Sequence, residues 1–276
     1  MKRILLALSL LLPLLSCRKE EGPVRDRLVV EGWIDSGGNP RVMVTSSFTP
    51  GADSVSLKDL YDHVLRWCKV TLSDGEEETV LTGMYSRDPF PSYIYSTGRM
   101  RGEVGKTYTL QVDADGRSAS ARTTIPPPCR LESLESVSFD GSDSLFLIRA
   151  RFRWDPERQE RYKFFVRIEN ADSSYVAASM SLSGTVAPDG MTEVTIRPGY
   201  SLFRRKRLAF ASGERVFIKI STLEEDLYWF WKTYEDQLSL ARTPFFSIDR
   251  GLPGNVEGAL GYFAGYGSTE YEITLP

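Results

Sequence analysis

His63, the single histidine of the chain, is the natural first candidate for catalysis. It follows Asp62 in a stretch of helical or loop character. A catalytic triad needs an imidazole to take the proton of a nucleophile, and a zinc site usually needs several imidazole or thiolate ligands. The chain has no Gly-x-Ser-x-Gly turn that would present a serine. His63 is therefore expected to have a surface or hydrogen-bonding role.

Acidic residues offer a second kind of chemistry. An acid with a base or nucleophile several ångströms away can hydrolyse a glycosidic bond without any histidine. The chain contains 37 acids, and no pair among them has a distinctive spacing. Asp113, Asp115 and Gly116 superficially match a calcium loop, but the remaining ligand positions are missing. A hairpin turn is expected there, and no metal or cofactor is predicted.

Cys17 carries a more specific signal, because of the residues that precede it. Lys2 and Arg3 form a positive head before an apolar run at 4–15, the layout of a secretory signal. That run is shorter than the ~20 residues of a membrane span. Leu14-Leu15-Ser16-Cys17 resembles the lipobox of bacterial lipoproteins, in which cleavage before the cysteine precedes acylation of its thiol and amine. Residues 1–16 are thus predicted to be a lipoprotein signal peptide; the alternative is an ordinary signal with an incidental cysteine.

Residues 17–26 are predicted to be a lipidated tether. Each buried methylene contributes about 0.8 kcal/mol, and two or more acyl chains hold a protein durably. Lys19, Glu20 and Glu21 look like the export signal that sends Bacteroidota lipoproteins to the outer face of the outer membrane; a solvated linker is the alternative. The expected location is the outer membrane, at the cell surface.

Cys68 and Cys129 are the two cysteines beyond the tether. Export would place them in an oxidising compartment, where they could pair. Cys68 occupies an inward strand position and Cys129 lies just past a strand end, so a disulfide and two separate buried thiols are both open. The net charge of −3 gives no reason to expect nucleic acid as a partner.

Alternating residues predict short strands after the tether. An apolar run at 28–34 ends in a turn cluster, a second strand follows at 42–45, and period-two alternation recurs near 67–72 and 108–112. A return strand is expected at 118–125, and Pro126-Pro127-Pro128 then marks a domain boundary, since proline cannot continue a central strand. Residues 27–126 are expected to form an immunoglobulin-like or transthyretin-like β-sandwich.

Residues 127–276 are expected to form a larger β-domain that carries one amphipathic helix, which makes the fold class mainly β. From 223 to 241 the apolar residues recur at helical spacing and fall on one face. Thr222 and Glu225 make a capping box at the start of this helix. Trp229 points away from its apolar face, so it either packs beneath a neighbouring loop or contacts a partner.

The loop at 86–95 sets aromatic rings among prolines, which leaves the rings little conformational freedom to lose on contact. Phe90, Tyr93 and Tyr95 are therefore candidate binding residues together with Trp229; the alternative is that these rings cap the core of the first domain. A basic run at 204–207 is expected to be a solvated hairpin edge, with lipid phosphates or an acidic partner loop as the alternative.

Glycines recur in the last strand segment, at positions 258, 261, 265 and 267. They do not fit Gly-x-Gly-x-x-Gly, and no helix follows them on which a phosphate could be seated. They are expected to let a strand lie close to neighbouring backbone, with Tyr262, Phe263 and Tyr266 packed around it.

Several of these segments also occur in a recognisable order. The lipobox is followed by LVVEGWI at 28–34, GKTYTLQV at 105–112, TTIP at 123–126, STL at 221–223 and NVEGALGYF at 255–263. Together they resemble a Bacteroidota outer-membrane lipoprotein family catalogued as domain of unknown function 4249, over nearly the whole chain beyond the signal. The resemblance implies a β-rich periplasmic or surface lipoprotein whose genes often accompany TonB-dependent outer-membrane transporters. It implies no catalytic residue.

These observations predict a non-enzymatic accessory protein of a TonB-dependent transporter system, anchored in the outer membrane. Two alternatives remain: a glycan- or peptide-binding surface lipoprotein, and a carboxylate-driven glycan hydrolase.

Overall fold

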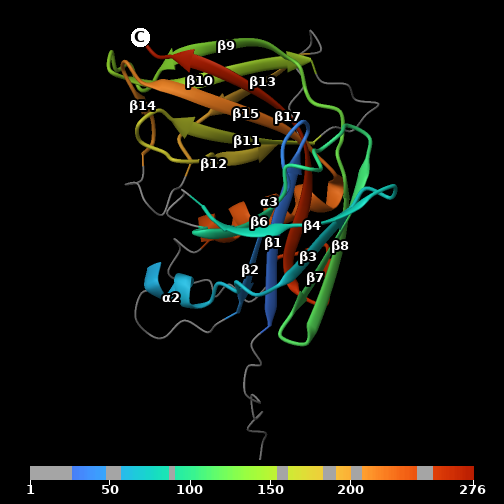
Figure 1. The fold of residues 1–276 in the computed structure, drawn as a ribbon. Helices are drawn as coiled ribbons and strands as arrows, with labels where there is room; N and C mark the ends of the chain where they lie inside the picture. The colour runs from blue at the N-terminus through green and yellow to red at the C-terminus, as the bar shows by residue number, and fades with distance from the viewer. Residues whose placement is uncertain are drawn as a thin grey trace, which may run out of the picture.

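The structure is a computed structural model that describes residues 27–47, 57–86, 91–153, 161–182, 191–199, 207–240 and 251–276. Its described residues form mostly strands, with two helices (Figure 1). No helix among them is long and apolar enough to cross a membrane. The mainly β fold class with sandwich-like packing is thereby confirmed.

One sheet of eight strands runs through the whole molecule. Its order is β12 (Val176–Leu182), β11 (Arg161–Ile168), β15 (Arg215–Leu223), β17 (Leu260–Thr274), β1 (Leu28–Asp35), β2 (Arg41–Ser46), β6 (Tyr93–Ser96) and β5 (Thr82–Tyr85). Strand β1 shows why these segments are strands. Its burial alternates residue by residue, as expected where one face of a strand packs against a core.

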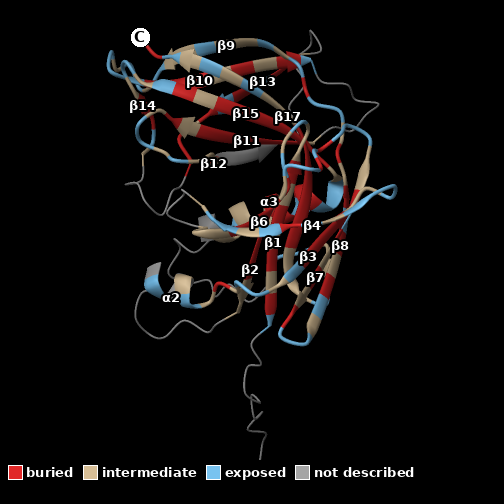
Figure 2. Cartoon of the chain, in the orientation of Figure 1, coloured by how far each residue is buried: buried red, intermediate tan, exposed pale blue. Residues whose placement is uncertain are grey.

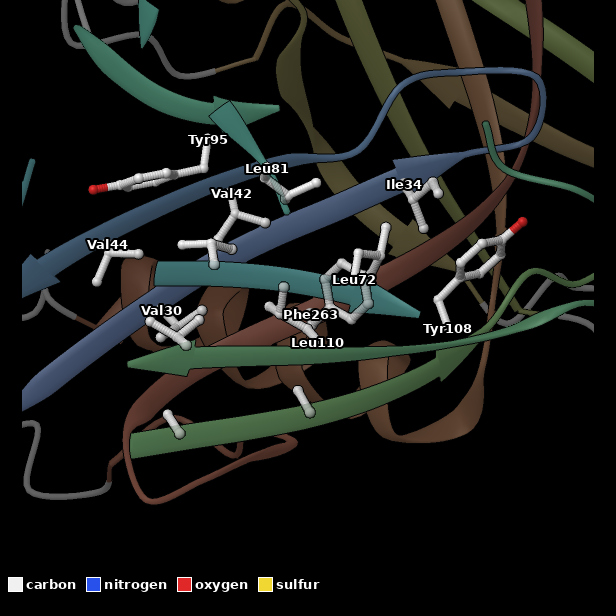
Figure 3. Close-up of a cluster of buried hydrophobic side chains, with 14 of the residues drawn as sticks. Val30, Ile34, Val42, Val44, Leu72, Leu81, Tyr95, Tyr108, Leu110 and Phe263 are labelled. Carbon is white, nitrogen blue, oxygen red and sulfur yellow. The ribbon is translucent and has the colours of Figure 1, made fainter. Parts of the chain in front are cut away.

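Two smaller sheets cover one face of this long sheet. The first has the order β16 (Val256–Glu257), β8 (Arg117–Thr124), β7 (Thr107–Ala114), β3 (Lys69–Ser73) and β4 (Glu78–Val80). The second has the order β13 (Met191–Ile196), β10 (Leu145–Arg153) and β14 (Phe210–Ala211), and β9 (Leu131–Ser138) also pairs with β10. Each sheet encloses its own apolar core against the long sheet. Figure 2 shows these buried layers in red, and Figure 3 shows side chains such as Val30, Leu72 and Leu110 meeting between the layers of the first core.

Strand β17 links the two halves. It pairs in parallel with β1 through residues 260–266 and antiparallel with β15 through residues 267–274. Phe263 from this strand belongs to the first core, and Tyr271 and Ile273 pack against the second. The boundary near residue 126 stays a prediction, but each core draws on this carboxyl-terminal strand.

The glycines of the β16–β17 region allow close backbone contact, as predicted. A Cβ on Gly258 would stand 2.4 Å from Ser118 O, and one on Gly267 would stand 2.1 Å from Pro126 O. Such distances are too short for any side chain. The predicted hairpin at 113–116 is also confirmed. Asp115 and Gly116 have φ of 49° and 71° between β7 and β8, the conformation that favours short hairpins.

Helix α3 (Glu225–Leu240) is the predicted amphipathic helix, and a short helix α2 (Leu57–Asp62) precedes His63. The prediction of a capping box at the start of α3 was wrong. Thr222 lies within β15, where it pairs with Tyr162 and Gly267, so the strand continues to the residue before Glu224. The Glu224 carboxylate instead accepts hydrogen bonds from Thr123 Oγ1 and Thr124 N, both at 2.9 Å. This contact ties the start of α3 to β8.

Candidate functional site

A cleft of about 670 Å³ lies on the face of the eight-stranded sheet that is turned away from both sandwich cores. Alternation along the strands separates the two faces. On β1, Val30 and Ile34 enter the first core, whereas Glu31, Trp33 and Asp35 line the cleft. We call this site the aromatic cleft, because six rings line it: Trp33, Phe165, Tyr175, Trp231, Tyr262 and Tyr266.

Helix α3 forms one wall of the aromatic cleft. Its apolar face packs on the same side of the sheet, where Phe230 lies 4.4 Å from Tyr262 between ring centroids and Trp231 lies 5.8 Å from Phe165. Trp231 also donates a hydrogen bond from Nε1 to the hydroxyl of Tyr266 at 3.2 Å. The rings are therefore fixed by packing and by hydrogen bonding, which lowers the entropy cost of ordering them around a ligand.

An ion pair lines the aromatic cleft. Lys219 donates to both carboxylate oxygens of Asp35, at 3.0 and 3.1 Å, and the Ser268 hydroxyl donates to Asp35 Oδ1 at 2.6 Å. Three rings surround the ammonium group: its Nζ is 4.9 Å from the centroid of Phe165, 5.4 Å from Tyr175 and 5.5 Å from Tyr266. Lys219 is thus a resident cation held by one carboxylate and an aromatic cage.

Glu31 is the second acid of the cleft. The Tyr262 hydroxyl donates to Glu31 Oε1 at 2.9 Å. Burial raises the pKa of Glu31 above its ordinary value, and the bond from Tyr262 only partly opposes that shift. Burial also raises the pKa of Tyr262 and of Tyr266, so both hydroxyls stay protonated. A carboxyl with a perturbed pKa in a cleft is a frequent mark of a functional site.

Charges of both signs line the cleft. Two cations, Arg41 and Lys219, face three acids, Glu31, Asp35 and Glu270. Arg41 also lies over the Trp33 ring, 5.7 Å from its centroid. Among the residues that the structure describes, no group of three or more His, Cys, Asp or Glu side chains is placed to hold a metal ion. The arrangement combines aromatic faces with paired donors and acceptors, which suits a polar ligand without net charge.

Among the described residues, none of the sequence-predicted site residues lines the aromatic cleft. Cys17, Lys19, Glu20, Glu21 and Phe90 fall outside the described residues. His63 has the predicted hydrogen-bonding role, with its Nδ1 2.8 Å from Ser46 Oγ.

The candidate binding residues Tyr93 and Tyr95 cap the first core. Tyr95 is 2% exposed and belongs to that core, and Tyr93 packs against it. Their neighbours Ile94 and Ser96 point to the other face of β6 and line the aromatic cleft. The binding prediction for Tyr95 is corrected accordingly, whereas Tyr93 is half-buried and its binding role stays a prediction.

Trp229 is 51% exposed and donates from Nε1 to Glu225 Oε1 at 3.4 Å. It therefore does not pack beneath a loop, and it lies outside the aromatic cleft. Cys68 and Cys129 are not joined by a disulfide, because they pack against different cores. Arg207, the described end of the basic run, pairs with Glu214 through two contacts of 2.6 and 2.8 Å.

The residues of the aromatic cleft were not predicted from the sequence. One signal was available: the period-two alternation in 28–35 places Glu31, Trp33 and Asp35 on one face of a strand, where two acids beside a tryptophan are unusual for a buried surface. Their partners on β15 and β17 gave no local signal.

Replacing Glu31 by glutamine is expected to change the pH dependence of stability. The pKa of Glu31 is raised in the folded state, so the folded protein keeps a proton that the unfolded chain releases. Wild-type stability should therefore fall as pH rises above the ordinary glutamate pKa. Glutamine keeps an acceptor for Tyr262 and has no charge. Relative to wild type, Glu31→Gln should gain stability in urea unfolding as pH rises above the ordinary glutamate pKa of about 4.3.

The exposed Glu257 supplies the control for this experiment. Glu257→Gln should follow the wild-type curve at every pH. Parallel pH curves for wild type and Glu31→Gln would show that Glu31 is not desolvated.

Comparison with known proteins identifies the family of the chain. No curated protein matches the chain. A solved structure, bovine butyrophilin, aligns over 90% of this chain and 99% of its own, with 10% identity and a TM-score of 0.21, which is too low to support a shared fold. The family model described as Domain of unknown function (DUF4249) matches residues 19–272. The chain belongs to this family.

Proposed function

We propose that this protein is a non-enzymatic binding lipoprotein, anchored in the outer membrane at the cell surface, which holds a neutral oligosaccharide in the aromatic cleft beside a TonB-dependent transporter. The observation that carries the ligand proposal is the cleft itself, with six rings around polar groups of both charges. Its volume lies within the roughly 300–1,000 Å³ of small-molecule sites.

The ligand class follows from the chemistry of the lining. The half-buried rings of Trp33 and Tyr175 can pack against the C–H faces of sugar rings, and their stiffness makes that contact favourable. Hydroxyl groups both donate and accept, so they match a lining of carboxylates, serine hydroxyls, Asn39 and Arg41. A strongly charged ligand would find no excess of opposite charge here.

Binding without turnover is supported by the use of one of the three acids. Asp35 already accepts bonds from Lys219 and Ser268, so it is committed to holding the cleft together. A glycosidase needs one acid able to donate a proton and a second free to act as base or nucleophile. The hydrolase alternative would be supported if an oligosaccharide shortened on incubation with the protein.

The anchor and the location are supported by the sequence. Lys2, Arg3, the apolar run and the lipobox at 14–17 support acylation of Cys17, and Lys19, Glu20 and Glu21 resemble the surface-export signal. The family resemblance supports the neighbouring transporter. Mass spectrometry of the mature terminus tests the anchor, and copurification from native membranes in mild detergent tests the partner.

Replacing Trp33 by alanine is expected to weaken oligosaccharide binding at least about tenfold, because a buried aromatic anchor typically contributes more than 1.4 kcal/mol. A panel of neutral oligosaccharides would first be screened on the purified protein. The dissociation constants of wild type and Trp33→Ala would then be compared by calorimetry, with circular dichroism as a check on folding.

Trp229→Ala is the matched control, since Trp229 is exposed and lies outside the cleft. It should bind like wild type. Equal affinity of Trp33→Ala and wild type for a captured oligosaccharide would rule out the aromatic cleft as its binding site.

A further inference from the structure

A second surface stands out at the end of the molecule where the described chain begins. Trp67, in the coil between α2 and β3, is 94% exposed, and Tyr85 on the edge strand β5 is 71% exposed. Arg66 joins them: its guanidinium lies 5.7 Å from the Tyr85 ring centroid. We call these three residues the Trp67 patch. Trp67 is the most exposed large apolar side chain among the residues that the structure describes.

The exposure of Trp67 is built into the fold. On one side of it, Leu65 N donates to Val44 O at 2.9 Å. On the other side, Cys68 N donates to the Tyr95 hydroxyl at 3.0 Å, and that hydroxyl donates in turn to Leu65 O at 3.1 Å. The coil is therefore fixed to the first core on both sides of the ring. Trp67 points outward because its neighbours are held inward.

The Trp67 patch lies close to the point where the chain enters β1. Arg27 N donates to Ser47 Oγ at 2.8 Å, and Ser47 N donates back to Arg27 O at 2.7 Å. The adjacent residue pairs with the segment that carries the patch, since Ser46 N donates to His63 O at 2.9 Å. Figure 1 shows α2 at the same lower end of the molecule as the start of β1.

Distance along the chain then limits the distance to the membrane. Cys17 precedes Arg27 by ten residues, and a fully extended residue spans at most ~3.6 Å, so acylated Cys17 keeps Arg27 within roughly 36 Å of the bilayer. The end of the molecule that carries the Trp67 patch is the end held near the lipid.

From this placement we infer that the Trp67 patch docks on the surface of the bilayer that holds the lipids of Cys17. This inference rests on the proposed anchor. The indole of Trp67 enters the headgroup region, where tryptophan and tyrosine are enriched, and Arg66 extends its charge to the lipid phosphates. The tether and the docked ring together fix the orientation of the protein, because a tether alone leaves it free to rotate.

The charges near the Trp67 patch indicate which lipid headgroups are sufficient for docking. Asp62 and Asp115 line the hollow beside Trp67. The nearby cations have acidic partners, since Arg117 pairs with Asp115 and Lys69 lies opposite Asp113 on β7. No excess of positive charge therefore surrounds Arg66. Docking therefore depends on the aromatic ring, and it should occur on zwitterionic vesicles and change little with salt.

The test separates docking from native acylation. A Cys17→Ser chain with an amino-terminal histidine tag would be bound to phosphatidylcholine vesicles through a nickel-chelating lipid. Tryptophan emission would be compared with and without lipids brominated near the headgroup. We expect bromine-dependent quenching in this chain and its loss in the Trp67→Phe variant. Trp229→Phe, which removes another exposed tryptophan, should keep it.

Equal quenching with and without Trp67 would overturn the inference, and so would quenching that appears only after a membrane protein partner is added. The proposed anchor fails separately, if mass spectrometry finds the native terminus unacylated. Trp67-dependent quenching in the tagged chain would support the lipid-docking chemistry in either case.

Discussion

Replacing Gly261 by alanine is expected to lower the free energy of unfolding by roughly 3–5 kcal/mol. Gly261 has φ of 113°, a conformation that side chains rarely adopt. A Cβ there would stand 1.9 Å from Val30 O and 2.8 Å from Val30 C. Both atoms are backbone of the neighbouring strand, so no rotamer change relieves the clash. The strand pair β1–β17 would have to separate locally.

Urea unfolding of Gly261→Ala and wild type measures this effect, and limited proteolysis serves if the variant is too unstable to purify. Gly98→Ala is the matched control, because a Cβ on Gly98 meets nothing within 4 Å. It should change stability by less than about 1 kcal/mol. A Gly261→Ala protein that unfolds at the wild-type midpoint would show that β1 and β17 do not pair in this register.

The same substitution should also disturb the aromatic cleft. Strand β1 supplies Glu31, Trp33 and Asp35, and β17 supplies Tyr262 and Tyr266. Their separation depends on the register that pairs Val30 with Gly261. Gly261 therefore links the stability of the long sheet to the shape of the site.

How much of the fold could be predicted depends on how far apart along the chain the contacting residues are. Alternation within 28–34, the turn at 113–116 and the helical spacing after 223 are local patterns, and the structure confirms a strand, a hairpin and a helix there. The parallel pairing of β1 with β17 joins segments more than two hundred residues apart, and nothing in either segment specifies the other. The cleft needs side chains from several such strands, so it emerges only in the assembled sheet.

Local signals also failed where a tertiary contact overrode them. Thr222 and Glu225 have the spacing of a capping box, but pairing with β11 and β17 keeps Thr222 in a strand. Tyr95 belongs to a loop whose aromatic and proline composition predicts binding, but its ring packs in the first core. In both cases the neighbours that decide the outcome come from distant parts of the chain.

Replacing Glu235 by alanine is the second substitution expected to have a large effect. Lys163 on β11 is 1% exposed, and its Nζ contacts Glu235 of α3 and donates to Ala178 O at 3.0 Å. Burial lowers the pKa of Lys163, and the Glu235 carboxylate opposes that shift. Without Glu235 the buried ammonium loses its counter-charge. We expect a loss of roughly 2–4 kcal/mol, less than for a fully enclosed pair because Glu235 is 21% exposed.

A matched control lies one residue further along the same helix. Lys232 and Asp236 are 2.6 Å apart but 41% and 56% exposed, so Asp236→Ala should cost less than about 0.5 kcal/mol. Comparable losses in Glu235→Ala and Asp236→Ala would contradict the assignment of Lys163 as a buried charge. Urea unfolding of the two variants gives the comparison directly.

The double variant Lys163→Met with Glu235→Leu tests whether stability requires the ion pair itself. The alternative is that stability requires only that no buried charge is left unpaired. Two apolar side chains of similar size leave no charge uncompensated, so most of the stability lost in Glu235→Ala should return. Lys163 also lies under the Trp231 ring, 4.9 Å from its centroid, and Trp231 forms a wall of the aromatic cleft. If the double variant regains stability but binds the oligosaccharide more weakly than wild type, the ion pair serves to position Trp231. If both stability and affinity return, packing alone places the helix.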